Sequence, residues 1–248
     1  LWGAAGGMVF EHETSWDAQD RFGWVEKHSA DIAAAALRVL GIADPPPPVG
    51  SPRPGPLPET IETTFYSARI DAATGAPVSL KTKPAGREML GGPANVLVLE
   101  KRTGHGEPGD FCDPRPQRPR LGSSSAHRPV ITVAESELAI TVEARSDFHA
   151  ARRVMRFNKT NPRIDFTTEV KDLPDLSVLV AEFPLAETPA EIRRGIPFGF
   201  SRDDNHVGGI VPAVRYSDYS TPGQGGAALL DRGLSGGETS GHVPILSL

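Results

Sequence analysis

Short apolar runs separated by glycine and proline fill residues 162–248 and limit the folds open to this chain. The first run, PRIDFTTEV, places Ile164, Phe166, Thr168 and Val170 on one face of an extended chain and polar side chains on the other. This period of two is typical of a β-strand that buries one side. The later runs LVAEFPL, IPFGFSRDD, VPAVRYSDYS and GAALLDRGLSG have the length and punctuation of strands in an antiparallel sandwich. The sequence therefore predicts a mainly β fold.

The same pattern continues upstream. Apolar residues alternate with polar ones over residues 66–70, and a turn ending on glycine follows at 71–75. Residues 95–99 are mostly apolar without a break, as expected of a strand covered on both sides. Residues 130–133 and 138–142 predict a hairpin. About ten strands without a long helix favour a large antiparallel β-sandwich.

The N-terminal part has a different pattern of apolar residues. Apolar residues at spacings of three and four over residues 17–40 predict one amphipathic helix. Residues 44–58 contain PPPP and PRPGPLP and predict an extended linker, with a ligand for a proline-binding module as the alternative. Residues 104–125, rich in glycine, proline and arginine, predict a long loop. The predicted organisation is a helical segment over 1–43, the linker, and a β-domain over 59–248.

The order of these motifs resembles the C-terminal β-domain of glycoside hydrolase family 38, the retaining zinc-dependent α-mannosidases. The words RIDFTTEV, EFP, IPFG, VPA and GAALL stand in the order of that family, and FYSARIDAATGAPVSL followed by GREML resembles its first hairpin. The likeness covers residues 61–248. The helix before it resembles the last helix of the three-helix middle domain. The resemblance implies a galactose-mutarotase-like β-sandwich (a supersandwich) preceded by a helical segment.

The resemblance also implies the chemistry of a parent protein that hydrolyses α-mannosides. The family uses a zinc ion held by a His-x-Asp pair, an aspartate nucleophile and a later histidine. No histidine of this chain is followed two residues later by aspartate, and no segment resembles the nucleophile's strand. In the family both parts lie in an N-terminal α/β domain. We therefore expect no catalytic residue here, no activity of the chain by itself, and the missing catalytic domain of the same protein as its partner.

His12 is the candidate zinc ligand. The family's later ligand is a histidine in the loop before this helix, in contexts such as EHTW, and FEHETSW offers Glu11-His12 at that place. Aligning Glu13 and Trp16 instead puts Thr14 at the ligand position. A polar loop histidine without a metal is the alternative. The helical zinc-protease motif is excluded, because Trp16 stands where its second histidine must be.

Two further motifs carry nucleophilic or charged side chains. Residues 233–237 read GLSGG and fit the G-x-S-x-G pattern of serine hydrolases, but that elbow needs a helix directly after it. Because GGETSGHVP cannot form one, we predict a turn. The cluster after IPFG predicts a solvated loop, with contact to a sugar or to a neighbouring domain as the alternative. Its members are Arg202, Asp203, Asp204 and His206.

Composition excludes several partners. A net charge of −5 provides no basic surface, so nucleic acid is not expected. No apolar run reaches the roughly 18 residues of a membrane span. Cys112 is the one cysteine and cannot form an internal disulfide, so the compartment stays open. The rival to a mannosidase fragment is a non-catalytic carbohydrate-binding or structural β-sandwich module.

The two ends of the sequence add one expectation each. The chain opens at Leu1 without a visible signal peptide. It closes on HVPILSL, inside a predicted strand, so the β-domain is expected to be truncated at its C-terminus.

Overall fold

The computed structural model describes most of the chain from residue 52 onward. Before that it describes positions 28, 29, 31, 32, 35 and 39, so the helix predicted over 17–40 lies largely outside the described residues. The described ranges are 52–101, 118–196, 199–202, 211–212, 215–221, 225–231, 236–240 and 243–247. The chain divides into two compact units, Leu1–Val49 and Gly50–Leu248. The second unit carries the sheets. No helix within the described ranges is long and apolar enough to cross a membrane.

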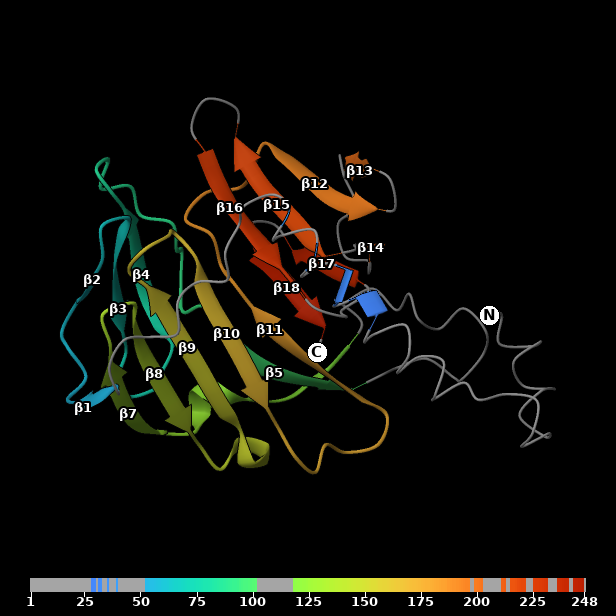
Figure 1. Ribbon diagram of the computed structural model, residues 1–248. Helices are drawn as coiled ribbons and strands as arrows, with labels where there is room; N and C mark the ends of the chain where they lie inside the picture. Colours follow the sequence, from blue (N-terminus) through green and yellow to red (C-terminus); the bar gives the residue numbers. More distant parts are fainter. Residues whose placement is uncertain are drawn as a thin grey trace. The chain divides into compact units, whose positions relative to one another are not determined.

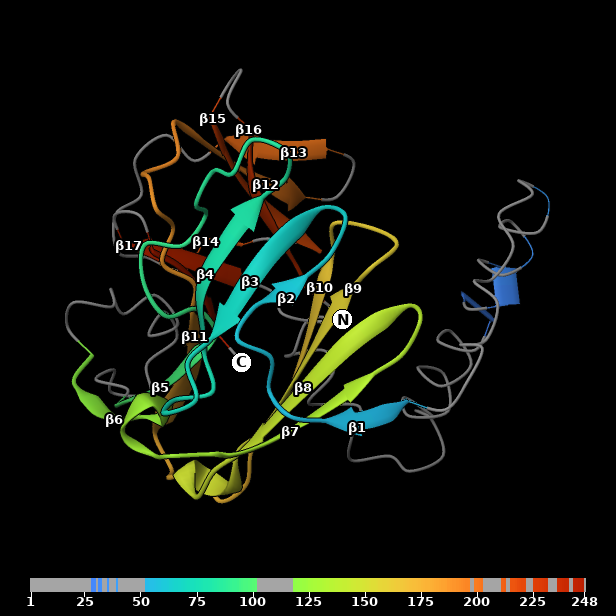
Figure 2. The same ribbon diagram turned by 90° about the vertical axis from the view of Figure 1, so that its left-hand side faces the viewer.

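Two antiparallel sheets pack against each other in the first part of this unit (Figures 1 and 2). The five-stranded sheet has the order β1 (Arg53–Gly55), β7 (Val130–Glu135), β8 (Ala139–Arg145), β9 (Arg152–Asn158) and β10 (Ile164–Glu169). The three-stranded sheet has the order β2 (Ile61–Glu62), β3 (Tyr66–Ile70) and β4 (Pro77–Thr82). Their facing apolar side chains form one core cluster, which includes Tyr66, Ile70, Val142, Met155 and Phe157.

Alternation along each strand decides which side chains enter this core. On β3 the residues Tyr66, Ala68 and Ile70 are buried, while Ser67 is half-buried and Arg69 is exposed. On β10 the register with β9 places Ile164 opposite Phe157, and the even-numbered apolar residues pack against the cores. The predicted strands and their buried faces are confirmed here.

The six-stranded sheet is buried around its central strands. Its order is β14 (Val211–Pro212), β17 (Gly236–Ser240), β18 (Val243–Ser247), β11 (Ser177–Glu182), β5 (Val96–Lys101) and β6 (Arg120–Ser123). Leu97 and Leu99 of β5 join one apolar cluster, whereas Val96 and Val98 join another. This strand is therefore covered on both faces, as its unbroken apolar run predicts.

A four-stranded sheet completes the unit, with the order β13 (Gly199–Arg202), β12 (Glu191–Ile196), β15 (Tyr216–Thr221) and β16 (Gly225–Leu230). Neighbouring strands run antiparallel in all four sheets, as in the β12–β15 pair. The mainly β, antiparallel sandwich that the sequence predicts is thus confirmed.

Three local expectations differ from the structure. Residues 53–55, inside the predicted linker, pair with β7 as β1, because Pro54 can stand on an edge strand where its missing N–H leaves no ladder bond open. Residues 120–123, inside the predicted loop, pair with β5 as β6, and residues 102–117 lie outside the described ranges. The described strands also exceed the predicted ten, since several of them are only two to four residues long.

Tyr66 makes the stability of the core depend on pH in the alkaline range. Burial raises the pKa of its phenol to about 12 from the ordinary 10.0, because the phenolate loses its hydration. The hydroxyl donates toward the carbonyl oxygens of Asn158 at 3.2 Å and Arg163 at 3.4 Å. The folded pKa is raised, so the stabilisation is fully present below pH 10 and is lost as the pH rises toward 12.

We therefore expect the stability advantage of the natural chain over Tyr66→Phe to shrink by about 2–3 kcal/mol between pH 10 and pH 12. Urea unfolding of both proteins at a series of pH values measures this difference. Groups common to the two proteins cancel in the comparison. An advantage that stays constant through pH 12 would contradict the prediction.

Candidate functional site

A groove of about 470 Å³ opens on the three-stranded sheet, on the face opposite its core. The alternation that buries Tyr66 and its even-numbered neighbours turns the odd-numbered side chains outward. The register sets Ser67 of β3 opposite Lys81 of β4, and Arg69 of β3 opposite Ser79 of β4. All four of these side chains line the groove. Its floor is therefore hydroxylic and cationic.

Glu88 forms one wall of the groove and is held by four hydrogen bonds. Its carboxylate accepts from the Ser79 hydroxyl at 2.5 Å and from the backbone amides of Leu80, Met89 and Leu90 at 2.8–3.1 Å. Burial alone would raise the pKa of Glu88, but these hydrogen bonds outweigh it and lower the pKa. Glu88 is thus a fixed anion whose oxygens are already engaged.

The wall beyond Glu88 is tied to a distant part of the chain. The Gly91 amide donates to the Pro184 carbonyl at 3.0 Å, and the Ala186 amide donates to the Met89 carbonyl at 3.0 Å. A Cβ atom on Gly91 would lie 2.3 Å from the Leu185 carbonyl oxygen, so only glycine permits this approach. These contacts hold the wall in place without a ligand.

Arg69 and Lys81 are the free cations of the groove. Both are exposed, and neither has a hydrogen-bond or ion-pair partner among the residues that the structure describes. Two nearby cations behave differently: Lys83 pairs with Glu62 at 2.5 Å, and Arg87 pairs with Glu187 at 2.7 Å. The groove therefore presents two cationic donors that the described part of the chain leaves unused.

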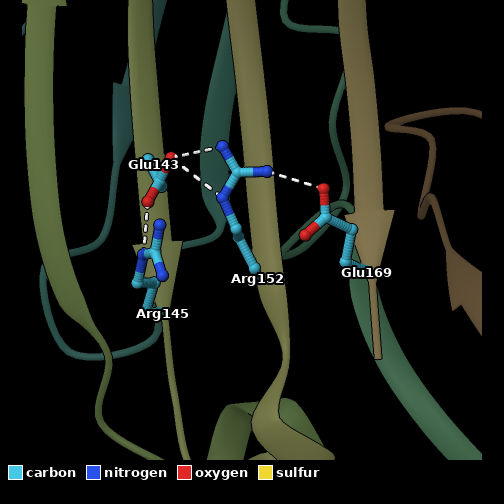
Figure 3. A network of polar contacts seen from close by, with 4 residues as sticks. All are labelled: Glu143, Arg145, Arg152 and Glu169. Atoms are coloured by element: carbon cyan, nitrogen blue, oxygen red, sulfur yellow. Dashed lines mark hydrogen bonds and ion pairs between the residues drawn. The ribbon is translucent and has the colours of Figure 1, made fainter. Parts of the chain in front are cut away.

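A second polar array crosses the outer face of the five-stranded sheet and is internally paired. Glu143 on β8 accepts from Arg145 on the same strand and from Arg152 on β9 at 2.8 and 3.1 Å (Figure 3). Arg152 also reaches Glu169 on β10 at 2.7 Å. The hydrogen bond from Arg152 is the main cause that lowers the pKa of Glu143. Because its charges satisfy one another, this array joins three strands and offers less to a ligand than the groove does.

The predicted zinc ligand cannot be placed. His12 and the alternative Thr14 lie outside the described residues. Within the described ranges no group of three or more His, Cys, Asp or Glu side chains could hold a metal ion. The described part of the chain thus offers no zinc site of its own, and a role for His12 stays a prediction.

The cluster after IPFG is placed in part. Arg202 ends strand β13 and pairs with Arg193 of β12, so the loop predicted at this residue is wrong, although its side chain is exposed to solvent as predicted. The Nε of Arg202 lies 2.8 Å from Glu191 Oε1, and Glu191 also accepts from Arg193 at 2.9 and 3.0 Å. Arg202 therefore serves strand pairing. The other members, Asp203, Asp204 and His206, lie outside the described residues.

The G-x-S-x-G motif leads into a strand. Residues Gly236–Ser240 form β17 and pair with β18, whereas the serine-hydrolase elbow needs a helix at this place. Ser235 itself lies outside the described residues. The motif does not have the structural context of a nucleophile elbow.

Asn158, the first residue of an N-x-T sequon, is engaged in the fold. Its side-chain amide donates to the Arg163 carbonyl at 2.9 Å and to Asp165 Oδ2 at 3.0 Å, and the residue is 6% exposed. A glycan on this nitrogen would replace one of its two hydrogens, so at least one of the two hydrogen bonds would be lost. The side chain of Asn158 therefore stabilises the connection between β9 and β10.

Comparison with solved structures finds the same architecture in a known protein. The chain is similar to the crystal structure of an alpha-mannosidase from Enterococcus faecalis V583, with a TM-score of 0.63 and 11% sequence identity. What the two share is the fold. The match covers 81% of this chain and 26% of that chain, so this chain spans about a quarter of the mannosidase's length. No protein-family model matches the sequence, and a search of curated proteins finds no match.

Proposed function

We propose that this chain is the C-terminal β-domain region of a retaining, zinc-dependent α-mannosidase of glycoside hydrolase family 38. The observation that carries the proposal is the fold match to an alpha-mannosidase over 81% of the chain. The family-ordered motifs from RIDFTTEV to GAALL support it independently, because they are read from the sequence and not from the fold. The catalytic domain then belongs to another part of the same protein.

The proposed division of labour follows from the chemistry. A retaining glycosidase needs one carboxylate as nucleophile and a second carboxyl as acid and then base. Zinc, when bound, supplies a template that grips sugar hydroxyls and orients the ring. In this proposal the nucleophile and the His-x-Asp ligands come from the catalytic domain. His12 adds a neutral imidazole nitrogen, a common zinc ligand.

The test uses the complete parent enzyme and an aryl α-mannoside. We expect His12→Ala to lose bound zinc on dialysis and to lose hydrolysis with it, because one ligand of the ion is gone. Thr14→Ala, two residues away, is the matched variant and is expected to keep both. Full zinc retention in His12→Ala, or loss in Thr14→Ala alone, refutes the role of His12.

A non-catalytic carbohydrate-binding module is the second candidate. The preformed groove on β3 and β4 favours it, since such a module needs a site but no nucleophile. Coding DNA upstream of Leu1 separates the two: an in-frame domain with His-x-Asp supports the enzyme, and its absence supports the module. Turnover of an aryl α-mannoside by the 248-residue chain itself would contradict both.

A further inference from the structure

We propose that the groove on β3 and β4 binds a saccharide carrying one negative charge, such as a uronate or a sugar sulfate. The proposal does not depend on the identity of the parent protein, because it rests on the groove alone. The volume of about 470 Å³ lies within the roughly 300–1,000 Å³ typical of small-molecule sites. The groove is therefore large enough for a sugar ring and its substituents.

The negative charge of the ligand follows from the charges of the lining. The ionisable side chains there are Arg69, Lys81 and Glu88, so two cations and one carboxylate leave one positive charge. Glu88 contributes its charge to this balance but forms no ion pair with either cation, because its oxygens accept from Ser79 and three backbone amides. A single carboxylate or sulfate on the ligand balances this charge.

The spacing of the two cations suits one shared anion. Arg69 stands opposite Ser79, and Lys81 stands opposite Ser67, so the cations are diagonal neighbours on one face of the hairpin. Diagonal neighbours lie about 7–8 Å apart at the backbone, which long side chains readily span. Like charges at this separation repel each other. An anion between them removes that repulsion and accepts charge-assisted hydrogen bonds from both.

The saccharide character follows from the remaining polar atoms. Thr60 and Ser67 bring hydroxyls to the lining. A hydroxyl both donates and accepts, which matches the hydroxyls of a sugar ring. The wall from Glu88 to Gly92 is held by Pro184 and Ala186, so binding does not have to order it.

The experiment titrates the 248-residue chain with four probes and follows binding by calorimetry or amide chemical shifts. Glucuronate and glucose 6-sulfate carry the ring and one charge, glucose carries the ring alone, and acetate carries the charge alone. We expect both charged sugars to bind, or one of them to do so and thereby identify the anionic group. Glucose and acetate should each bind about tenfold more weakly or worse, because each lacks one set of contacts.

Variants assign the binding to the groove. Arg69→Ala and Lys81→Ala should each weaken binding of the charged sugar by about tenfold. Arg156→Ala is the matched control, since Arg156 is an exposed and unpaired arginine among the described residues, on the outer face of β9. The proposal is overturned if neither charged sugar binds, or if glucose or acetate binds as tightly as the charged sugars do. It is also overturned if all three variants weaken binding equally.

Discussion

Replacing Arg153 by alanine is expected to lower the free energy of unfolding of the β-unit by about 3–5 kcal/mol. The side chain is 1% exposed and donates to the Asn95 carbonyl at 3.0 Å and the Thr74 carbonyl at 2.6 Å. Alanine leaves both carbonyl oxygens without this donor and opens a cavity in the space of a large side chain. Burial also lowers the pKa of Arg153, which marks how far its charge is removed from water.

Arg156→Ala is the matched control for this prediction as well. Arg156 lies on the same strand, three residues further along and on the opposite face, and it is exposed. Its removal should change stability by no more than about 0.5 kcal/mol. Equilibrium unfolding in urea, followed by circular dichroism, compares the variants. If the two substitutions destabilise the protein equally, Arg153 does not have the structural role assigned to it.

The position of Arg153 connects stability to the groove. Thr74 belongs to the turn between β3 and β4, and Asn95 directly precedes β5. One guanidinium on β9 therefore fixes the hairpin that carries Arg69 and Lys81 against the five-stranded sheet. The groove occupies the free face of that hairpin, so this buried contact supports its geometry from behind.

Periodicity in the sequence predicts the strands but not this contact. The β9 sequence RRVMRFN requires one of two adjacent arginines to face inward, since successive side chains alternate between faces. Met155 and Phe157 indicate that Arg153 shares their face. The acceptors, however, lie 58 and 79 residues away along the chain. Local patterns carry no information on such partners, so alternation predicts the inward face of Arg153 but not the carbonyl oxygens that it binds.

The sequence predicts only part of the candidate groove. Alternation over residues 66–70 already assigns Ser67 and Arg69 to the outer face of a strand. Glu88 follows β4 without a periodic pattern of its own, so the sequence does not predict its backbone bridge to Lys81 or its hydrogen bond with Ser79. Short strands such as β6 were likewise missed, because glycine and proline around them are typical of loops. Turn-like composition does not exclude pairing at a sheet edge.

Glu100→Gln is expected to lower the free energy of unfolding by about 3–5 kcal/mol, because it removes one partner of a buried ion pair. Glu100 on β5 and Arg118 are 1% and 2% exposed, and Arg118 Nε lies 3.0 Å from Glu100 Oε2. Glutamine keeps the shape of the side chain but removes its charge. The Arg118 guanidinium then stays buried without that carboxylate.

The double variant Glu100→Met with Arg118→Met separates the contribution of the two charges to stability from the contribution of side-chain packing. Two apolar side chains of similar size need no compensation for lost hydration, so the double variant should recover most of the stability that Glu100→Gln loses. Urea unfolding of the natural chain, Glu100→Met, Arg118→Met and the double variant forms a complete thermodynamic cycle, and Glu100→Gln is measured beside it. Additive losses in the double variant would mean that the two residues act separately. Recovery would instead show that the buried pair contributes little net stability.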